Sequence, residues 1–232
     1  MAKAKHQKTS RDLEASLAAD RTKVIESLND SREIAPRLDR YVAALLQWQA
    51  TTNLIAPSTI PELWSRHIAD SLQLLRLAPD ATRWVDLGSG GGFPGLVIAC
   101  ALADKPRAVV HLVESNLKKA AFLREAVRLT GASARVHAVR IEDFVDGFNE
   151  PVEIVTARAL ASLDNLLDKA YPLLKRGAQA LFLKGQDVEG ELTAASKYWT
   201  MDTELIPSIT DAGGRIVRVV SAQRLVPPPS DG

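Results

Sequence analysis

A short apolar stretch runs directly into a glycine-rich turn between Trp84 and Gly95, and this segment limits the folds open to the chain. Residues 84–87 have the pattern of a buried strand, and an apolar helix follows from about Phe93. Glycines permit positive φ and let the backbone approach a ligand, while the unpaired N–H groups at a helix start bind polar groups. The segment therefore predicts a cradle for a nucleotide-like cofactor.

Two cofactor classes fit this turn. Gly90, Gly92 and Gly95 form G-x-G-x-x-G, the dinucleotide fingerprint, in which the first glycine directly follows the strand. Here the strand ends at Gly88, so the turn is better described as D-x-G-x-G-x-G, beginning at Asp86. An acid in that position can accept a hydrogen bond from an ammonium group, which suits S-adenosylmethionine.

A second acid supports a cofactor without choosing between the two classes. Glu114 ends the next apolar stretch, residues 108–113. In that position a carboxylate can accept hydrogen bonds from both ribose hydroxyls of either cofactor. Glu114 therefore predicts a bound ribose but does not indicate which of the two cofactors carries it.

The composition indicates a globular protein of the cytoplasm. The chain has 232 residues, 46% of them hydrophobic, and a formal net charge of +1, so any nucleic-acid surface must be a local patch. The one cysteine, Cys100, lies in an apolar helical stretch and favours a reducing compartment without disulfides. The first ten residues are rich in lysine without an apolar run, so no signal peptide is expected.

The period of the apolar residues changes near residue 80. Before it, apolar residues recur at helical spacing, which predicts a helical domain over residues 12–79, with Pro36 and Pro61 near the helix starts. After it, strands and helices alternate over residues 80–226, and residues 1–11 and 227–232 are expected to be loose tails. This order predicts an α/β fold of the Rossmann-like kind, a doubly wound and mostly parallel sheet. Its strands are expected at residues 84–87, 108–113, 135–139, 152–157, 179–183 and 216–220.

The carboxyl ends of these strands are where a ligand should bind. Ile141 and Glu142 follow the third strand, where they can meet an adenine edge. Arg158 follows the fourth strand and offers a bidentate donor to a ligand, or else pairs with Asp86 or Glu142. Lys184 ends the fifth strand and either faces a phosphate or is solvated.

Two further pairs of residues have alternative interpretations. Tyr171 and Lys175 match the Y-x-x-x-K of short-chain dehydrogenases, but Pro172 is expected to interrupt the helix there. His67 and Asp70 stand three residues apart on a predicted helix from residue 62 to 75, so they can form a satisfied pair or contact RNA. The histidines show no spacing typical of metal ligands, so no metal is expected.

If the cofactor is a methyl donor, motifs that the chain lacks reduce the range of atoms that could accept the methyl group. The chain has no Asn/Asp-Pro-Pro-Tyr/Phe tetrapeptide to hold an exocyclic amine, and Cys100 is poorly placed to attack a pyrimidine. A ring nitrogen with its own lone pair, such as guanine N7, needs neither a base nor a covalent intermediate. Most of the rate enhancement then comes from holding that nitrogen close to the methyl group and in line with it.

Five segments, taken together in their order and spacing, resemble the bacterial RsmG (GidB) family over about residues 30–225. They are Asn53-Leu54, Arg66-His67-Ile68-Ala69-Asp70-Ser71-Leu72, the run from Asp86 to Gly95, Arg140-Ile141-Glu142, and Arg158-Ala159. The departures are mild: Ile55-Ala56 replaces the commoner Thr-Ser, and the basic N-terminal stretch is longer than the family minimum.

The resemblance implies a class I methyltransferase that moves a methyl group from S-adenosylmethionine to N7 of the guanine conventionally numbered 527 in 16S rRNA. By position, it implies cofactor contacts at Gly88, Phe93, Ile141, Glu142 and Arg158. Together with the residues discussed above, the expected cofactor site is Gly88, Gly90, Phe93, Glu114, Ile141, Glu142 and Arg158. The expected substrate contacts are His67, Asp70, Lys184 and Arg158.

The sequence alone leaves three alternatives open: the class of protein, the form of the substrate and the role of a basic helix face. The chain could instead be a nicotinamide-dependent oxidoreductase that uses Tyr171 and Lys175, or a ribosome-assembly protein that binds RNA without catalysis. The substrate could be free rRNA, an assembly intermediate or the finished small subunit. Lys118, Lys119, Arg124 and Arg128 could extend a phosphate-binding face or form a solvated helix face.

Overall fold

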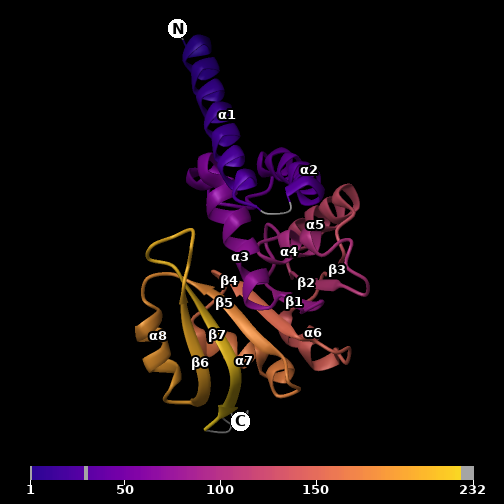
Figure 1. Cartoon of the computed structure of the whole chain (residues 1–232), viewed down its shortest axis with the longest axis vertical. Coiled ribbons are helices and arrows are strands. Elements are labelled where there is room, and N and C mark those ends of the chain that lie inside the picture. The colour runs from indigo at the N-terminus through magenta and orange to yellow at the C-terminus, as the bar shows by residue number, and fades with distance from the viewer. Residues whose placement is uncertain (1, 29–30, 226–232) are drawn as a thin grey trace.

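The computed structural model describes residues 2–28 and 31–225 and contains one seven-stranded sheet (Figure 1). The strand order is β3-β2-β1-β4-β5-β7-β6. Strands β1 to β5 are parallel, whereas β7 runs antiparallel to both β5 and β6. The order reverses between β1 and β4, which is where a sheet of this kind binds its ligand. The strands are β1 Arg83–Leu87, β2 Val109–Val113, β3 Ala134–His137, β4 Ile154–Arg158, β5 Gln179–Lys184, β6 Trp199–Pro207 and β7 Arg215–Arg224.

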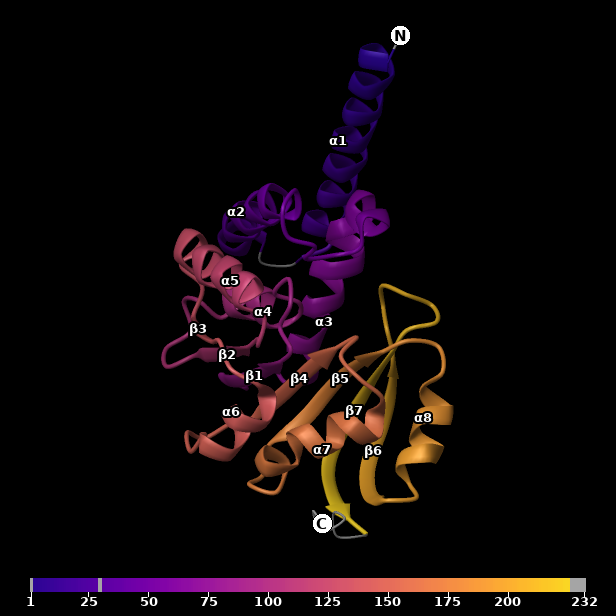
Figure 2. The ribbon, with the colours of Figure 1, turned by 180° about the vertical axis from the view of Figure 1, so that it is seen from behind.

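Helices cover both faces of this sheet (Figures 1 and 2). Alternate residues of β1 face opposite ways, so Trp84 packs with α2, α4 and α5, whereas Val85 packs with α6, α7 and α8. The helices are α1 Ala2–Glu26, α2 Ser31–Gln49, α3 Asp70–Leu77, α4 Gly95–Ala101, α5 Leu117–Thr130, α6 Ile141–Gly147, α7 Leu163–Leu174 and α8 Val188–Ala195. A 3-10 helix, η1 Pro57–Glu62, and a π-helix, η2 Trp64–Ala69, precede α3.

The N-terminal helices share a hydrophobic core with the sheet. Leu38 and Tyr41 of α2 are fully buried in the same cluster as Leu96 of α4 and Phe122 of α5. The hydroxyl of Tyr41 donates a hydrogen bond to the carbonyl of Gly91 in the glycine-rich turn. The N-terminal helices therefore support the turn directly. The domain boundary near residue 79 stays a prediction from the sequence.

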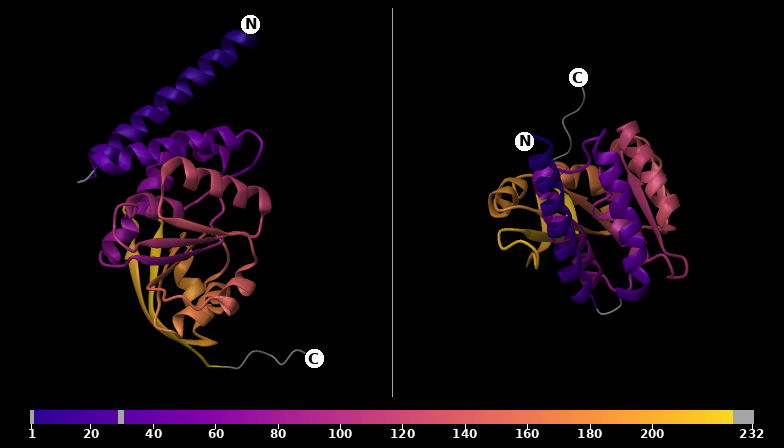
Figure 3. Two further views of the ribbon diagram at one scale, coloured as in Figure 1. Left: turned by 90° about the vertical axis from the view of Figure 1, so that its right-hand side faces the viewer. Right: turned by 90° about the horizontal axis from the view of Figure 1, so that it is seen from above.

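The C-terminal half of helix α1 is anchored to the rest of the molecule, and the helix extends away from it toward the N-terminus (Figure 3). Asp20 accepts hydrogen bonds from the backbone N–H groups of Trp64 and Ser65, and Arg21 pairs with Asp39 at 2.6 Å. The prediction of a loose tail is wrong for residues 2–11, which continue α1. Alanine and lysine at residues 2–5 are good helix formers, which the expectation overlooked.

Each of the six expected strands is present; the ends of five are shifted by at most two residues, and the last continues four residues further, to Arg224. The strand β6 was not predicted, because this edge strand is mostly polar or only half-buried and has β7 as its one partner in the described sheet. The expected tail at residues 227–232 lies outside the described residues. Among the described helices, none combines the length and the apolar character that a membrane crossing requires.

Two details of the predicted helices are wrong. Helix α2 begins at Ser31, so Pro36 lies inside it and leaves one backbone carbonyl of the helix without its usual N–H donor, while the nearby Ala35 and Leu38 are buried. The single helix expected over residues 62–75 is divided, because residues 64–69 form the π-helix η2 before α3 begins at Asp70. The wider turn of a π-helix changes which side chains face one another.

The brace from α2 can be tested by Tyr41→Phe, which removes the hydroxyl and keeps the ring. The carbonyl of Gly91 would lose its donor in a buried site, so we expect a loss of about 1–3 kcal/mol in the free energy of unfolding. Urea denaturation measures the change. Tyr198→Phe is the matched control, because Tyr198 is 53% exposed and its variant should stay within about 0.5 kcal/mol of the unchanged protein.

Candidate functional site

The turn between β1 and α4 depends on glycines for two different reasons. Gly88, Gly90 and Gly92 have φ angles of 71°, 52° and 96°, a region that side chains disfavour. A Cβ atom at Gly92 would also lie 2.8 Å from the hydroxyl of Tyr41, and one at Gly88 would lie 2.7 Å from Leu160. A Cβ at Gly90 would meet nothing closer than 3.8 Å, so this position faces open space. That space is a cavity at the carboxyl ends of β1 and β2.

This cofactor cavity has a volume of about 400 Å³. Glu114 lies on its wall and is largely buried. Its Oε2 accepts from the N–H of Gly90 at 2.9 Å, and its Oε1 accepts from the N–H of Asn116 at 2.7 Å. Each oxygen keeps a further lone pair, so the carboxylate can still receive the hydroxyl groups of a ribose. The lining includes six of the predicted cofactor residues, Gly88, Gly90, Phe93, Glu114, Ile141 and Arg158.

Asp86 does not have the role that the sequence suggested. Its side chain is fully buried beneath the turn, where it accepts from Thr156 Oγ1 at 2.9 Å and from the N–H of Gly95 at 3.2 Å. Burial raises its pKa to about 6, and the hydrogen bond from Thr156 opposes that rise. Asp86 therefore fixes the start of α4, and it does so outside the lining of the cofactor cavity.

The side chain of Glu142 also lies outside this lining. Its carboxylate forms an ion pair with Lys169 and is 51% exposed. The hydrogen bond from Lys169 lowers the pKa of Glu142 from its usual value. Glu142 occupies the first turn of α6 next to Ile141, which does line the cavity, so any contact through the carboxylate requires it to leave Lys169.

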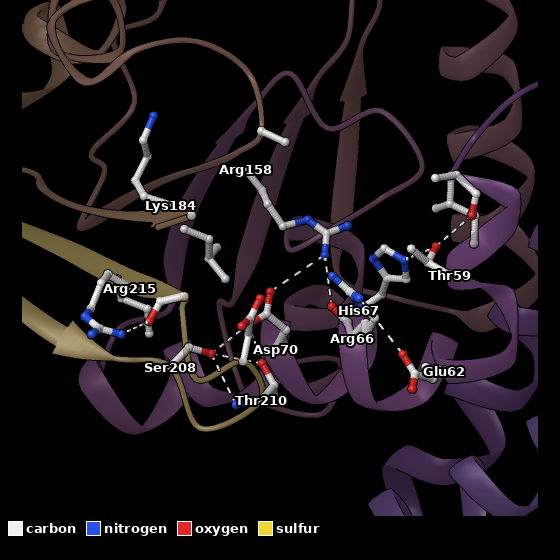
Figure 4. A pocket seen from close by; sticks show the side chains of 18 of the residues that line it. Thr59, Glu62, Arg66, His67, Asp70, Arg158, Lys184, Ser208, Thr210 and Arg215 are labelled. Atoms are coloured by element: carbon white, nitrogen blue, oxygen red, sulfur yellow. Dashed lines mark hydrogen bonds and ion pairs between the residues drawn. The ribbon is translucent and has the colours of Figure 1, made fainter. Parts of the chain in front are cut away.

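A second and larger cavity, of about 700 Å³, adjoins the first (Figure 4). We call it the acceptor cavity. Leu54, Arg158 and Ala159 belong to the walls of both cavities. Several residues of its wall were not predicted as site residues, because they come from loops or, for Thr59, from the short 3-10 helix η1, where no periodic pattern indicates a site. These residues are Leu54, Ile55, Thr59, Ser208, Thr210 and Asp211.

Arg158, at the end of β4, lies between the two cavities. Its Nη1 is 3.7 Å from Asp70 Oδ2 and donates to the carbonyl of Arg66 at 3.4 Å, while its guanidinium lies 4.9 Å from the ring centre of Phe93. The structural partner predicted from the sequence was Asp86 or Glu142, and the structure shows Asp70 instead. Burial lowers the pKa of Arg158 and Asp70 opposes this, so the group keeps its charge.

His67 is a neutral residue in this environment. Its ring stacks on Phe93 with centres 4.9 Å apart. Thr59 Oγ1 donates to the carbonyl of Ala56 at 2.8 Å, so it accepts from His67 Nε2–H at 2.8 Å and leaves Nδ1 unprotonated. This Nδ1 is buried without a hydrogen-bond partner among the described residues. Burial and the charge of Arg158 lower the pKa of His67 to about 3.

The expected pair of His67 and Asp70 is wrong. Asp70 bonds to Gln73, Thr210 and Ser208, at 2.7, 2.7 and 3.3 Å, and its other oxygen faces Arg158. The physical reason is the π-helix, which ends between the two residues and alters their relative direction. Both side chains still belong to the wall of the acceptor cavity.

Lys184 also lies on this wall, but its ammonium group already has partners. It donates to the carbonyl of Ala161 at 2.8 Å and pairs with Glu191 at 2.6 Å, with its side chain 9% exposed. Neither sequence-based interpretation, a free phosphate contact or a solvated lysine, describes this arrangement. Lys184 ties β5 to α8 beside the cavity.

The tyrosine and lysine of the Y-x-x-x-K pattern lie away from both cavities. Tyr171 packs against Trp199 with ring centres 5.1 Å apart, and Lys175 caps the end of α7. Helix α7 continues through Pro172 to Leu174, so the expected interruption there is wrong. The position of Tyr171, rather than a broken helix, separates it from the glycine-rich turn.

The sheet order, the glycine-rich turn after β1 and the acid after β2 define a class I methyltransferase fold. Solved structures agree. The chain is similar to a putative O-methyltransferase from Klebsiella pneumoniae, with a TM-score of 0.58, 15% identity, and coverage of 88% of this chain and 96% of that one. It is also similar to the O-methyltransferase from Bacillus cereus in complex with SAH, with a TM-score of 0.55, 18% identity, and coverage of 90% and 100%.

The chain belongs to the GidB family, described as rRNA small subunit methyltransferase G, whose model matches residues 34–217. A relative from Bradyrhizobium sp. (strain BTAi1 / ATCC BAA-1182), named ribosomal RNA small subunit methyltransferase G, is 60% identical over 208 residues, which are 90% of this chain and 94% of that protein. A relative of the same name from Rhodopseudomonas palustris (strain BisB18) is 58% identical over 203 residues, 88% of this chain and 87% of that protein.

Gly90→Val tests whether the glycine-rich turn holds the cofactor. The new side chain would project into the cofactor cavity, so we expect the affinity for S-adenosylmethionine to fall by at least about a hundredfold, as measured by calorimetry.

The control is Gly177→Val. Gly177 also has a positive φ, of 96°, but a Cβ there would meet nothing within 4 Å, and the residue lies in the turn after α7. Both variants should lose stability through backbone strain of about 1–2 kcal/mol, but Gly177→Val should bind the cofactor normally. A folded Gly90→Val variant with unchanged affinity would contradict this assignment.

Proposed function

We propose that this protein transfers a methyl group from S-adenosylmethionine to N7 of guanine 527 in the 16S rRNA of the small ribosomal subunit. The observation that carries the proposal is the position of Arg158 between two adjoining cavities, of about 400 and 700 Å³. Membership of the family of rRNA small subunit methyltransferases supports the class of substrate. The particular base and ring nitrogen follow from the resemblance of the motifs.

The residues present fit the proposed cofactor. Gly90 leaves the space that a Cβ would otherwise fill, and Glu114 keeps free lone pairs for ribose hydroxyls. Ile141 supplies an apolar wall for an adenine ring. Arg158 suits a carboxylate because its guanidinium is a planar, charged donor on the wall of the same cavity. When bound, S-adenosylmethionine supplies an electrophilic methyl group on its sulfonium.

The acceptor cavity fits a base taken out of its stack. A nucleotide must leave its RNA neighbours before a ring nitrogen can line up with the methyl group, and a separate cavity for the base makes this possible. If Arg158 contacts the guanine, it must donate to O6 and leave N7 free, because N7 provides the lone pair that attacks. His67 is neutral and its Nε2–H is engaged by Thr59.

The protein therefore accelerates the reaction by holding the methyl group and the guanine N7 in the right relative positions. N7 carries no proton, so no residue has to act as a general base. Arg158, Glu114 and the glycine-rich turn hold the two reactants, and the largely buried Phe93 and Leu54 supply apolar parts of the cavity wall. We place this activity in the cytoplasm, where small subunits are assembled, without a metal.

Incubation with labelled S-adenosylmethionine tests the function. Small subunits that lack the modification should receive label, and mapping should place it on N7 of one guanine in 16S rRNA. Free rRNA and an assembly intermediate, tested in parallel, would identify the preferred substrate. Binding to rRNA without transfer of label would indicate a non-catalytic assembly protein, whereas binding of reduced nicotinamide would indicate an oxidoreductase.

The dependence of the rate on pH tests the mechanism. Because N7 needs no base and His67, with a pKa of about 3, is neutral in this range, the single-turnover rate should be nearly constant between about pH 7 and 9. The measurement uses saturating rRNA and cofactor. A tenfold rise per pH unit would contradict the mechanism and indicate an acceptor that must lose a proton.

A further inference from the structure

Asp70, at the start of α3, contacts two separate parts of the acceptor cavity (Figure 4). Its Oδ1 accepts from Thr210 Oγ1 at 2.7 Å and from Ser208 Oγ at 3.3 Å, both in the loop between β6 and β7. Its Oδ2 lies 3.7 Å from Nη1 of Arg158 at the end of β4. One carboxylate, 15% exposed, therefore joins the loop to the arginine that lies between the two cavities.

Gln73, one turn further along α3, fixes this arrangement. Its Nε2 donates to Asp70 Oδ1 at 2.7 Å and to Ser208 Oγ at 3.2 Å, while its Oε1 accepts from the backbone N–H of Ile209 at 3.0 Å. The side chain of Gln73 is buried and uses both its donor and its acceptor sides. The first three residues of the loop are thus held against α3 by a connected polar network.

The loop held in this way is part of the acceptor cavity. Four of its residues after Ile209 belong to the wall: Thr210, Asp211, Ala212 and Gly214. Asp70 is one of the partners that balance the buried charge of Arg158, so the two groups are expected to move together rather than separately. The wall of the acceptor cavity and the arginine beside the cofactor are consequently linked through a single carboxylate.

We propose that Asp70 is a positioning residue that couples the β6–β7 loop to Arg158, so that a guanine nucleotide in the acceptor cavity and the cofactor are held in one geometry. The inference rests on the proposed function and extends it to a residue that acts through others. It differs from the sequence-based expectation of a direct substrate contact at Asp70, because three side chains already donate to its Oδ1 and its Oδ2 faces Arg158. Coupling matters because a misplacement of about 1 Å can cost about a hundredfold in rate.

A double-mutant cycle tests the coupling. Thr210→Val removes the hydroxyl from the loop and keeps its shape, and Arg158→Lys removes the guanidinium and keeps the charge. Measured as kcat/KM for unmodified small subunits, the two changes should be non-additive by at least about threefold. The same cycle in an Asp70→Asn background should be additive, because the amide oxygen still accepts from Thr210 while the charge facing Arg158 is lost.

Thr203→Val is the matched control. It makes the same chemical change on β6 outside the lining of the acceptor cavity, so it should be additive with Arg158→Lys in both backgrounds. Additive effects of Thr210→Val and Arg158→Lys in the protein with Asp70 would overturn the proposal. Non-additivity that persists with Asp70→Asn would also overturn it, because another residue would then carry the coupling.

Hydrogen exchange gives a second readout that needs no methyl transfer. Arg158→Lys should speed exchange in residues 208–214, including the N–H of Ile209, by at least about threefold, and this effect should disappear with Asp70→Asn. If Arg158→Lys left the hydrogen-exchange rates of the loop unchanged, the proposed coupling would be wrong. If the unchanged protein transfers no methyl to small subunits, the proposed function fails, and exchange alone decides whether Asp70 links the loop to Arg158.

Discussion

The turn between β1 and α4 bends through three residues with positive φ, and most of the site is arranged around that constraint. Because Gly88 and Gly92 carry no side chains, Leu160 and Tyr41 can occupy the adjacent space. Tyr41 also donates to the turn from α2, so the N-terminal helices belong to the same structural unit as the cofactor cavity. Gly90 differs, because its missing side chain leaves room for a ligand rather than for protein.

A buried positive charge organises the second half of the site. Arg158 needs an anion nearby because burial is costly for a lone guanidinium, and Asp70 supplies it at 3.7 Å. Phe93 adds its ring face at 4.9 Å. A protonated histidine beside this group would place two positive charges together, which contributes to the low pKa of His67. Burial of the ring is the larger cause of that low pKa, so Arg158 accounts for the paired aspartate and adds to the neutrality of the histidine.

The parts of the fold that the sequence predicted are those with a local signal. The buried strands follow from runs of apolar residues, and the turn follows from its glycines. The strand β6, which was not predicted, lies at the sheet edge, where its residues are mostly polar or half-buried and form no apolar run. The predicted pair of His67 and Asp70 assumed a regular helix, and the π-helix η2 invalidated that assumption.

The sequence by itself determined which backbone positions must be glycine, which strands are buried and which family's motifs the chain carries. Only the tertiary structure decided the partners of the charged residues. Asp70 reaches Thr210, 140 positions away, and Asp86 turned inward to Thr156 and the start of α4 rather than toward a ligand. The physical reason is that the φ preference of a residue and the spacing of apolar residues depend on near neighbours in the chain. An ion pair depends instead on where distant loops meet across the sheet.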